Sequence, residues 1–211
     1  MSERKWPVVM ASQLIAGNPD SNVAICTLWT PRQKVAAMLD PSRYAVIGNL
    51  YSRDGLNYLI ENLLANPKIR FLIVTGVSQS DMAATLVPSD SRDAVTALFE
   101  KGIREEHGRL LVEANGAVLD PRFDPADVIR MLGAVHLVAT PLDSLHYSKL
   151  VQGISVGMGR HDRYREPVYY SPREGLVVDV LPSEGMGYTV RREAISEAWL
   201  SLLDLIMRYG R

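Results

Sequence analysis

Short apolar segments alternate with amphipathic segments along most of the chain. Residues 69–74 form an apolar run that is broken only by Arg70, and a Thr-Gly pair follows it. A run of this kind is typical of a strand that is buried on both faces of a parallel sheet. Residues 22–28 and 44–47 predict two more strands, because each is an apolar segment that ends at turn-forming residues.

The amphipathic segments predict helices between these strands. Residues 54–65 carry apolar side chains at steps of three and four, and Asp54 is placed to cap that helix. The other predicted elements are helices at residues 90–102 and 124–132 and strands at residues 110–113 and 135–139. Because strands and helices alternate, we expect an α/β fold: a Rossmann-like, open, mostly parallel sheet with helices on both faces.

The pattern changes beyond residue 140. Residues 153–165 are rich in Gly, Arg and His and predict a linker. Residues 176–180 and 187–190 flank a Pro-Ser-Glu-Gly turn, which predicts a small β-hairpin.

The last segment predicts a helix. Residues 195–207 repeat apolar side chains at helical spacing, and the resulting face is long enough to require cover by another surface. We therefore expect a homo-oligomer or a covering domain. The predicted domains are a Rossmann-like domain at residues 1–150 and a linker, hairpin and terminal helix at residues 151–211.

Composition and charge narrow the class of protein. The chain has 211 residues, 47% of them hydrophobic, and a formal net charge of -1. A near-neutral chain has no basic field to attract nucleic acid or an anionic membrane, so we expect neither as a partner. The apolar runs are of strand length and the first five residues are mostly polar, so we expect no signal peptide or membrane span and a cytoplasmic location.

The common nucleotide-binding and metal-binding motifs are absent from the sequence. It contains no GxGxxG, Walker-type loop, CxxC or HExxH pattern. The four histidines, His107, His136, His146 and His161, lack the spacing of a metal ligand set. The single cysteine, Cys26, lies inside an apolar run and is expected to be a core residue. We expect no catalytic residue and no metal site.

Small polar and aromatic residues follow the predicted strands. In a parallel sheet they would meet at the carboxyl edge, where open α/β folds bind ligands, although turn geometry alone also favours such residues there. The candidate ligand-binding residues are Trp29, Thr30, Asn49, Tyr51, Thr75, Gly76, Ser78, Asn115 and Gly116. Hydroxyls, backbone N–H groups and two aromatic faces suit a flat polar ligand.

Four separated segments carry a family resemblance. Residues 6–9 (WPVV), 17–28 (GNPDSNVAICTL), 62–76 (NLLANPKIRFLIVTG) and 115–118 (NGAV) resemble the A subunit of tetrahydromethanopterin S-methyltransferase, which is a corrinoid protein. The resemblance covers about residues 6–140. It implies a Rossmann-like fold with cobalamin at the strand ends and a histidine ligand to cobalt after the third of these segments. In this sequence the corresponding loop, residues 77–91, contains no histidine.

A second resemblance lies at the end of the chain. Residues 195–211 (ISEAWLSLLDLIMRYGR) are similar to the opening helix of thymidylate synthase-like proteins. This resemblance implies that a synthase-like domain of the same protein follows Arg211 and covers the helix.

Two functional hypotheses follow from these features. The first is a non-catalytic Rossmann-like binding or interaction domain at the start of a thymidylate synthase-type one-carbon protein. The alternative is a corrinoid- or pterin-binding methyl carrier related to the methyltransferase. The missing histidine favours the first, because protein ligation of cobalt needs a nitrogen donor. Cobalamin and a reduced pterin or folate are the cofactors that these hypotheses allow.

Overall fold

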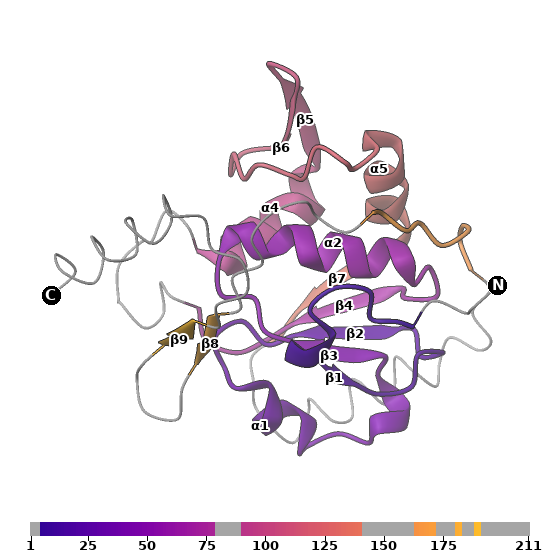
Figure 1. The fold of residues 1–211 in the computed structure, drawn as a ribbon, viewed down its shortest axis with the longest axis vertical. Helices are drawn as coiled ribbons and strands as arrows, with labels where there is room; N and C mark the ends of the chain where they lie inside the picture. Colours follow the sequence, from indigo (N-terminus) through magenta and orange to yellow (C-terminus); the bar gives the residue numbers. More distant parts are fainter. Residues whose placement is uncertain (1–4, 79–89, 141–162, 172–179, 183–187, 191–211) are drawn as a thin grey trace, which may run out of the picture. The chain divides into compact units, whose positions relative to one another are not determined.

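The computed structural model of the protein describes residues 5–78, 90–140, 163–171, 180–182 and 188–190 (Figure 1). The chain divides into two compact units, Met1–Tyr170 and Ser171–Arg211, and each is described by itself. The domain boundary that the sequence predicts after residue 150 lies outside the described residues and stays a prediction.

The first unit contains a five-stranded, mostly parallel sheet, as the sequence predicts. Its strands are β1 (Ile15–Ala16), β2 (Val23–Cys26), β3 (Val46–Gly48), β4 (Phe71–Val74) and β7 (His136–Ala139), in the order β1-β3-β2-β4-β7. Strands β2, β3, β4 and β7 are parallel, whereas β1 runs antiparallel to β3 at one edge. The sequence gives no signal for β1 because a strand of two residues is too short to show a period.

Helices cover both faces of this sheet. Figure 1 shows α1 (Arg32–Ala36) on one side and α2 (Leu56–Ala65) on the other. The side chains of β2 and β4 alternate between two apolar cores, one on each face. Ala24 and Leu72 join the core that contains α2, α4 (Ser91–Lys101) and α5 (Pro125–Ala134). Ile25 and Ile73 join the core that contains Val35 of α1.

The helix boundaries confirm two of the three predicted starts. Asp90 caps α4 by accepting hydrogen bonds from Arg92 N and Asp93 N, and Gly102 ends that helix. Asp124 caps α5, which begins at Pro125. The prediction that Asp54 caps the helix at residues 54–65 is wrong. Residues Arg53–Gly55 form a 3₁₀ turn, so the N-cap position of α2 falls on a glycine, without a side-chain cap.

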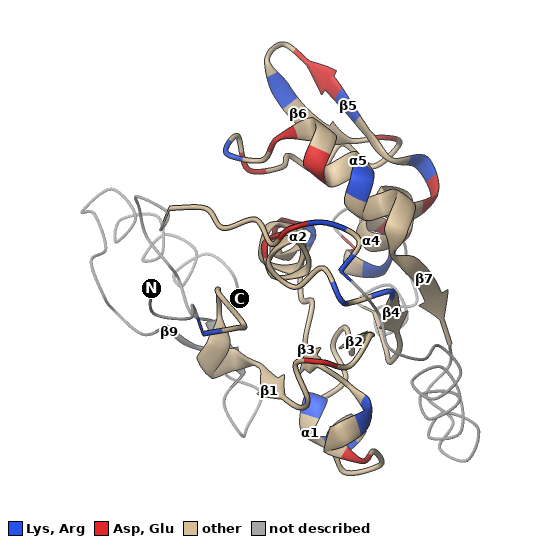
Figure 2. Cartoon of the chain, turned by 90° about the vertical axis from the view of Figure 1, so that its right-hand side faces the viewer, with Lys and Arg blue, Asp and Glu red and all other residues tan. Residues whose placement is uncertain are grey.

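The strand predicted at residues 110–113 forms, but it does not join the main sheet. It is β6 (Arg109–Val112), which pairs with β5 (Ile103–Glu106) in a separate antiparallel hairpin. This hairpin extends away from the five-stranded sheet (Figure 1) and carries charges of both signs (Figure 2). Three residues of β5 are exposed and most of its side chains are polar, so it has no apolar run that would predict a strand.

Within the first unit, a short segment after residue 162 packs against α2 and α5. Val168 N donates to Leu64 O at 3.0 Å, at the end of α2. Arg165 Nη2 lies 2.6 Å from Asp127 Oδ1 of α5, and the guanidinium of Arg70 stacks 4.8 Å from the ring centroid of Tyr164. These contacts close the core beside α2 and α5.

The second unit contains a small antiparallel hairpin of β8 (Val180–Pro182) and β9 (Tyr188–Val190). The predicted hairpin is therefore confirmed, with Pro182 paired in β8 opposite Tyr188 instead of lying in the connection. The predicted terminal helix at residues 195–207 lies outside the described residues.

Candidate functional site

The chain changes direction across the sheet between β2 and β4. Strand β2 pairs with β3 on one side and β4 on the other, and the helices that follow β2 and β4, which are α1 and α4, cover opposite faces. The chain therefore leaves β2 toward one face of the sheet and leaves β4 toward the other face. This topological switch point is where open α/β sheets bind ligands. We call residues 27–32, 49–51 and 75–78 the carboxyl edge.

Backbone and hydroxyl hydrogen bonds hold the loops after β2 and β4 together. Trp29 N donates to Val77 O at 3.0 Å, and Val77 N donates to Thr30 Oγ1 at 3.0 Å. Gly76 adopts φ 91°, and a Cβ atom there would lie 2.4 Å from Thr30 Oγ1 and 2.5 Å from Thr27 O. Only glycine fits this position, because it tolerates both the positive φ and the close approach.

Asn49 connects the loop after β3 to the loop after β2. Its Nδ2 atom donates to Thr27 Oγ1 at 2.9 Å, to Leu28 O at 2.9 Å and to Thr30 O at 2.7 Å. Its Oδ1 atom accepts a hydrogen bond of 3.1 Å from Arg32 Nη1. The amide is therefore fixed in one orientation, and it positions the guanidinium of Arg32.

Two aromatic side chains lie side by side at the carboxyl edge. Trp29 Nε1 donates to Tyr51 O at 3.0 Å, and the two rings meet edge to face with their centroids 5.0 Å apart. Both side chains are half-buried, and the neighbouring Leu28 is buried. The two rings supply an apolar surface beside the polar groups of Asn49 and Thr30.

Thr75 and Ser78 are buried in the loop after β4. Thr75 is 2% exposed, and its N–H donates to Cys26 O at 2.9 Å. Its Oγ1 atom has no hydrogen-bond partner among the residues that the structure describes. A buried hydroxyl without a partner is unfavourable, so this atom is the clearest polar group left for a ligand.

The carboxyl edge brings together seven of the nine residues that the sequence predicts for the site. These are Trp29, Thr30, Asn49, Tyr51, Thr75, Gly76 and Ser78. The other two, Asn115 and Gly116, follow β6 in the separate hairpin sheet, so the expectation that they share this edge is wrong. Gly116 has φ 70° and donates its N–H to Val112 O at 2.9 Å, which makes it a turn residue.

Sequence reasoning missed two polar residues of the edge, Thr27 and Arg32. Thr27 is fully buried, and its hydroxyl donates to Thr30 O at 2.8 Å. Arg32 begins α1 just after the predicted strand and the Trp-Thr-Pro turn. The sequence feature that could have identified Arg32 is its position as a cation shortly after the end of a predicted strand.

The described residues do not fit a cobalt ion that is ligated by a protein histidine. His107 lies in the turn between β5 and β6 with a side chain that is 92% exposed. His136 begins β7, at the opposite edge of the sheet, with its ring 5.6 Å from that of Phe71. Cys26 ends β2, but burial raises the pKa of its thiol to about 11, so it offers no thiolate at neutral pH. His146 and His161 lie outside the described residues.

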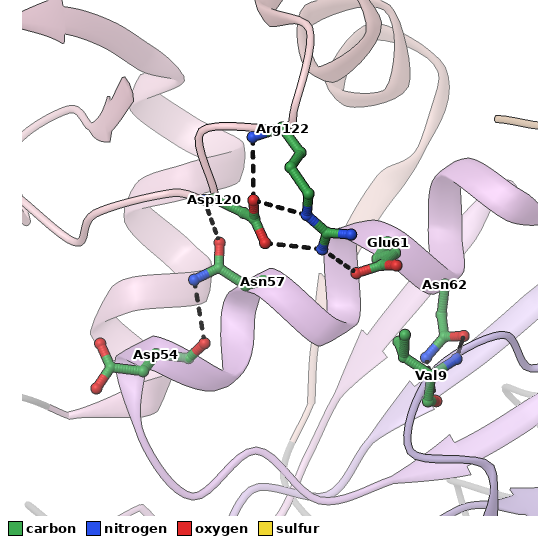
Figure 3. Close-up of polar contacts among 7 residues, drawn as sticks. All are labelled: Val9, Asp54, Asn57, Glu61, Asn62, Asp120 and Arg122. Atoms are coloured by element: carbon green, nitrogen blue, oxygen red, sulfur yellow. Dashed lines mark hydrogen bonds and ion pairs between the residues drawn. The ribbon is translucent and has the colours of Figure 1, made fainter. Parts of the chain in front are cut away.

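A second polar cluster joins α2 to the loop between β6 and α5 (Figure 3). Arg122 donates to Asp120 through Nε at 3.0 Å and through Nη2 at 2.8 Å, and Nη2 also contacts Glu61 Oε2 at 3.0 Å. Asp120 N donates to Asn57 Oδ1 at 2.8 Å. The hydrogen bond to Asp120 raises the pKa of Arg122, and the negative charge of Glu61 adds to this effect. We call these four residues the Arg122 cluster.

No helix in the described parts of the chain is long and apolar enough to cross a membrane.

Comparison with known proteins identifies the family. The family model of the A subunit of tetrahydromethanopterin S-methyltransferase matches residues 1–137. Similar curated proteins include the A subunit of Methanococcus aeolicus, 31% identical over 114 residues, and the second of two A subunits of Methanobrevibacter ruminantium, 30% identical over 114 residues. Each alignment covers 54% of this chain. The alignments cover 42% of the length of the first relative and 53% of the length of the second. The chain thus spans about half the length of the curated relatives it matches.

The matched residues include β1 to β6, α5 and every residue of the carboxyl edge. The match ends before residues 195–211, so it gives no support to the thymidylate synthase-like resemblance there. This chain belongs to the family of the A subunit of tetrahydromethanopterin S-methyltransferase.

Proposed function

We propose that this chain binds a methyl-carrying cofactor, a corrinoid or a reduced pterin, at the carboxyl edge, as one component of a methyl-transfer system. The name of its relatives describes an S-methyltransferase that uses a tetrahydropterin. The chain spans about half of those relatives, so this role is our inference from the family and from the edge.

The observation that carries the proposal is the hydroxyl of Thr75, which has no hydrogen-bond partner among the described residues. It lies at the switch point of the sheet, in a loop that hydrogen bonds and the close approach of Gly76 and Thr30 hold in place. A ligand atom that accepts or donates one hydrogen bond would satisfy this hydroxyl. The rings of Trp29 and Tyr51 offer a neighbouring surface for a flat or apolar part of the same ligand.

The groups at the carboxyl edge favour binding over catalysis. They are hydroxyls, an amide and a guanidinium, and the Cys26 thiol stays protonated. We infer that the chain holds and orients the methyl carrier while other components carry out the transfer. A corrinoid at this edge would bind without a histidine ligand from the described residues.

The connection to thymidylate synthase rests on residues 195–211 alone. These residues lie outside the described part of the chain and outside the family match. The family evidence favours the methyl-carrier hypothesis, and the synthase hypothesis stays a prediction.

Titration calorimetry with methylcobalamin and with 5-methyltetrahydrofolate tests the proposal. We expect the wild-type chain to bind one of them, and Thr75→Val to weaken that binding by about tenfold, because valine keeps the shape but removes the hydroxyl. The same substitution should leave the free energy of unfolding unchanged or raise it by about 1 kcal/mol, because it removes a buried group without a partner.

Thr27→Val is the matched control. Its hydroxyl is also buried but donates to Thr30 O and accepts from Asn49 Nδ2. We expect this variant to lose about 1 to 2 kcal/mol of stability. The proposal fails if the wild-type chain binds neither cofactor at concentrations of about 1 mM, which corresponds to about 4 kcal/mol of binding free energy. It also fails if Thr75→Val binds as tightly as the wild type.

A further inference from the structure

Arg32 is a cation at the carboxyl edge that a neutral amide holds in place. Its Nη1 atom donates to the neutral Asn49 Oδ1 at 3.1 Å, and its Nε atom is buried with no hydrogen-bond partner in the part of the chain that the structure describes. No described residue places a carboxylate against its guanidinium. We propose that Arg32 binds an anionic group of the ligand, a carboxylate or a phosphate, through its Nε–Nη2 edge. This inference rests on the proposed function and adds the charge of the ligand to it.

The hydrogen bond to Asn49 leaves the Nε and Nη2 donors of Arg32 for an anion. Asn49 occupies Nη1, and Asn49 is itself fixed by three hydrogen bonds to the loop after β2. The remaining Nε and Nη2 donors lie parallel on one side of the group, which is the arrangement that binds both oxygens of a carboxylate or phosphate. Burial of Nε without a partner is unfavourable in the free protein, and a bound anion would remove that cost.

Other arginines of the described chain show what a structural guanidinium looks like here. Arg122 contacts Asp120 and Glu61, and Arg165 contacts Asp127. In each case the charge is matched within the protein. Arg32 differs because the side chain that positions it is a neutral amide, so the charge remains available to a ligand.

An anionic group is common to both cofactor classes of the proposed function. Folate-type reduced pterins carry glutamate carboxylates, and cobalamin carries a phosphodiester in its nucleotide loop. Each class also has a close counterpart without the anion, 6-methyltetrahydropterin and cobinamide respectively. The four compounds separate recognition of the anion from recognition of the ring system.

The experiment compares wild type, Arg32→Gln, Arg32→Lys and the control Arg130→Gln, which changes an exposed arginine on α5. Calorimetric titrations use tetrahydrofolate, 6-methyltetrahydropterin, cobalamin and cobinamide. We expect Arg32→Gln to weaken binding of the anionic member of the bound pair by about 10- to 100-fold, and to change binding of its counterpart by less than about twofold. Lysine should restore part of the loss, because it keeps the charge without the fork.

Equal loss for both members of the bound pair, or no loss for either, overturns the inference while the proposed function stands. If the wild-type chain binds none of the four compounds, the proposed function is wrong, and a titration with inorganic phosphate decides on Arg32 alone. In that titration, a saturable shift of the Arg32 Nε–H resonance, assigned by its loss in Arg32→Gln, supports an anion site. If the Arg32 Nε–H resonance does not shift with phosphate, the inference of an anion site at Arg32 is wrong. Thermal unfolding of each variant verifies that it is folded.

Discussion

The Arg122 cluster and the carboxyl edge use the same kinds of polar groups in different ways. In the Arg122 cluster the guanidinium meets two carboxylates, and Glu61 is only 4% exposed (Figure 3). At the carboxyl edge Arg32 meets a neutral amide, and the Thr75 hydroxyl has no partner among the described residues. A buried charge that is matched within the protein stabilises a fold, whereas an ordered group that is left unmatched can recognise a ligand. The Arg122 cluster is therefore structural, and the carboxyl edge is the candidate site.

Removal of the Arg122 guanidinium should have the largest effect and tests the structural side of this comparison. Arg122→Met removes the cation that neutralises the carboxylates of Glu61 and Asp120, so we expect urea unfolding to show a loss of about 3 to 5 kcal/mol. Arg104→Met is the control, because Arg104 pairs with Glu106 through a side chain that is 45% exposed, and it should cost less than about 1 kcal/mol. Similar losses in the two variants would remove the distinction between a buried ion-pair cluster and a surface pair.

Gly76→Ala should have the next largest effect and tests how tightly the carboxyl edge is built. Its Cβ would meet Thr30 Oγ1 and a backbone oxygen at a φ of 91°, so we expect a loss of about 3 kcal/mol together with weaker cofactor binding. Gly116→Ala is the matched control, because its φ is also positive at 70° but nothing lies within 4 Å of the added atom. It should cost about 1 kcal/mol. Equal losses at the two glycines in thermal unfolding would show that the loops after β2 and β4 can separate easily.

The smallest effect concerns the thiol at the end of β2. Burial raises the pKa of the Cys26 thiol from 9.0 to about 11. The protonated thiol therefore stabilises the folded protein fully below about pH 9, and this stabilisation is lost as the pH rises through 11. The unfolded chain would ionise first. We expect the free energy of unfolding to fall by about 2 kcal/mol between about pH 8 and about pH 10.5 from this group alone.

Cys26→Ala isolates this contribution, because the variant should lack that part of the pH dependence. A flat difference between the two proteins across this range would mean that the thiol is not buried as described. Rapid alkylation of native Cys26 at neutral pH would mean the same. It would also show that a reactive thiolate lies next to the carboxyl edge.

Much of the fold follows from local sequence features. The apolar runs at residues 22–28 and 69–74 contain β2 and β4, because a strand buried on both faces needs apolar side chains at every position. The aspartates at positions 90 and 124 mark true helix starts, because a side-chain cap acts within one turn. Seven of the candidate residues lie at one edge for a related reason, because the ends of parallel strands meet there.

Strand pairing was decided only in three dimensions. Residues 109–112 pair with the polar strand β5, which turns at His107 and Gly108, and this removes Asn115 and Gly116 from the site. A strand sequence carries no information on which neighbour it will pair with when its alternation is weak. The same holds for β1, whose two residues add an antiparallel edge to the sheet.

The sequence alone determined a parallel α/β core and the loops that follow its strands, because burial and turn geometry act on neighbouring residues. The tertiary structure decided which polar groups in those loops have a partner of opposite charge within the protein. Arg32 and Arg122 look alike in the sequence, yet one faces Asn49 and the other faces Asp120 and Glu61. Whether a charge is satisfied depends on residues that are brought near it from elsewhere in the chain, and this pairing separates a structural arginine from one that can bind a ligand.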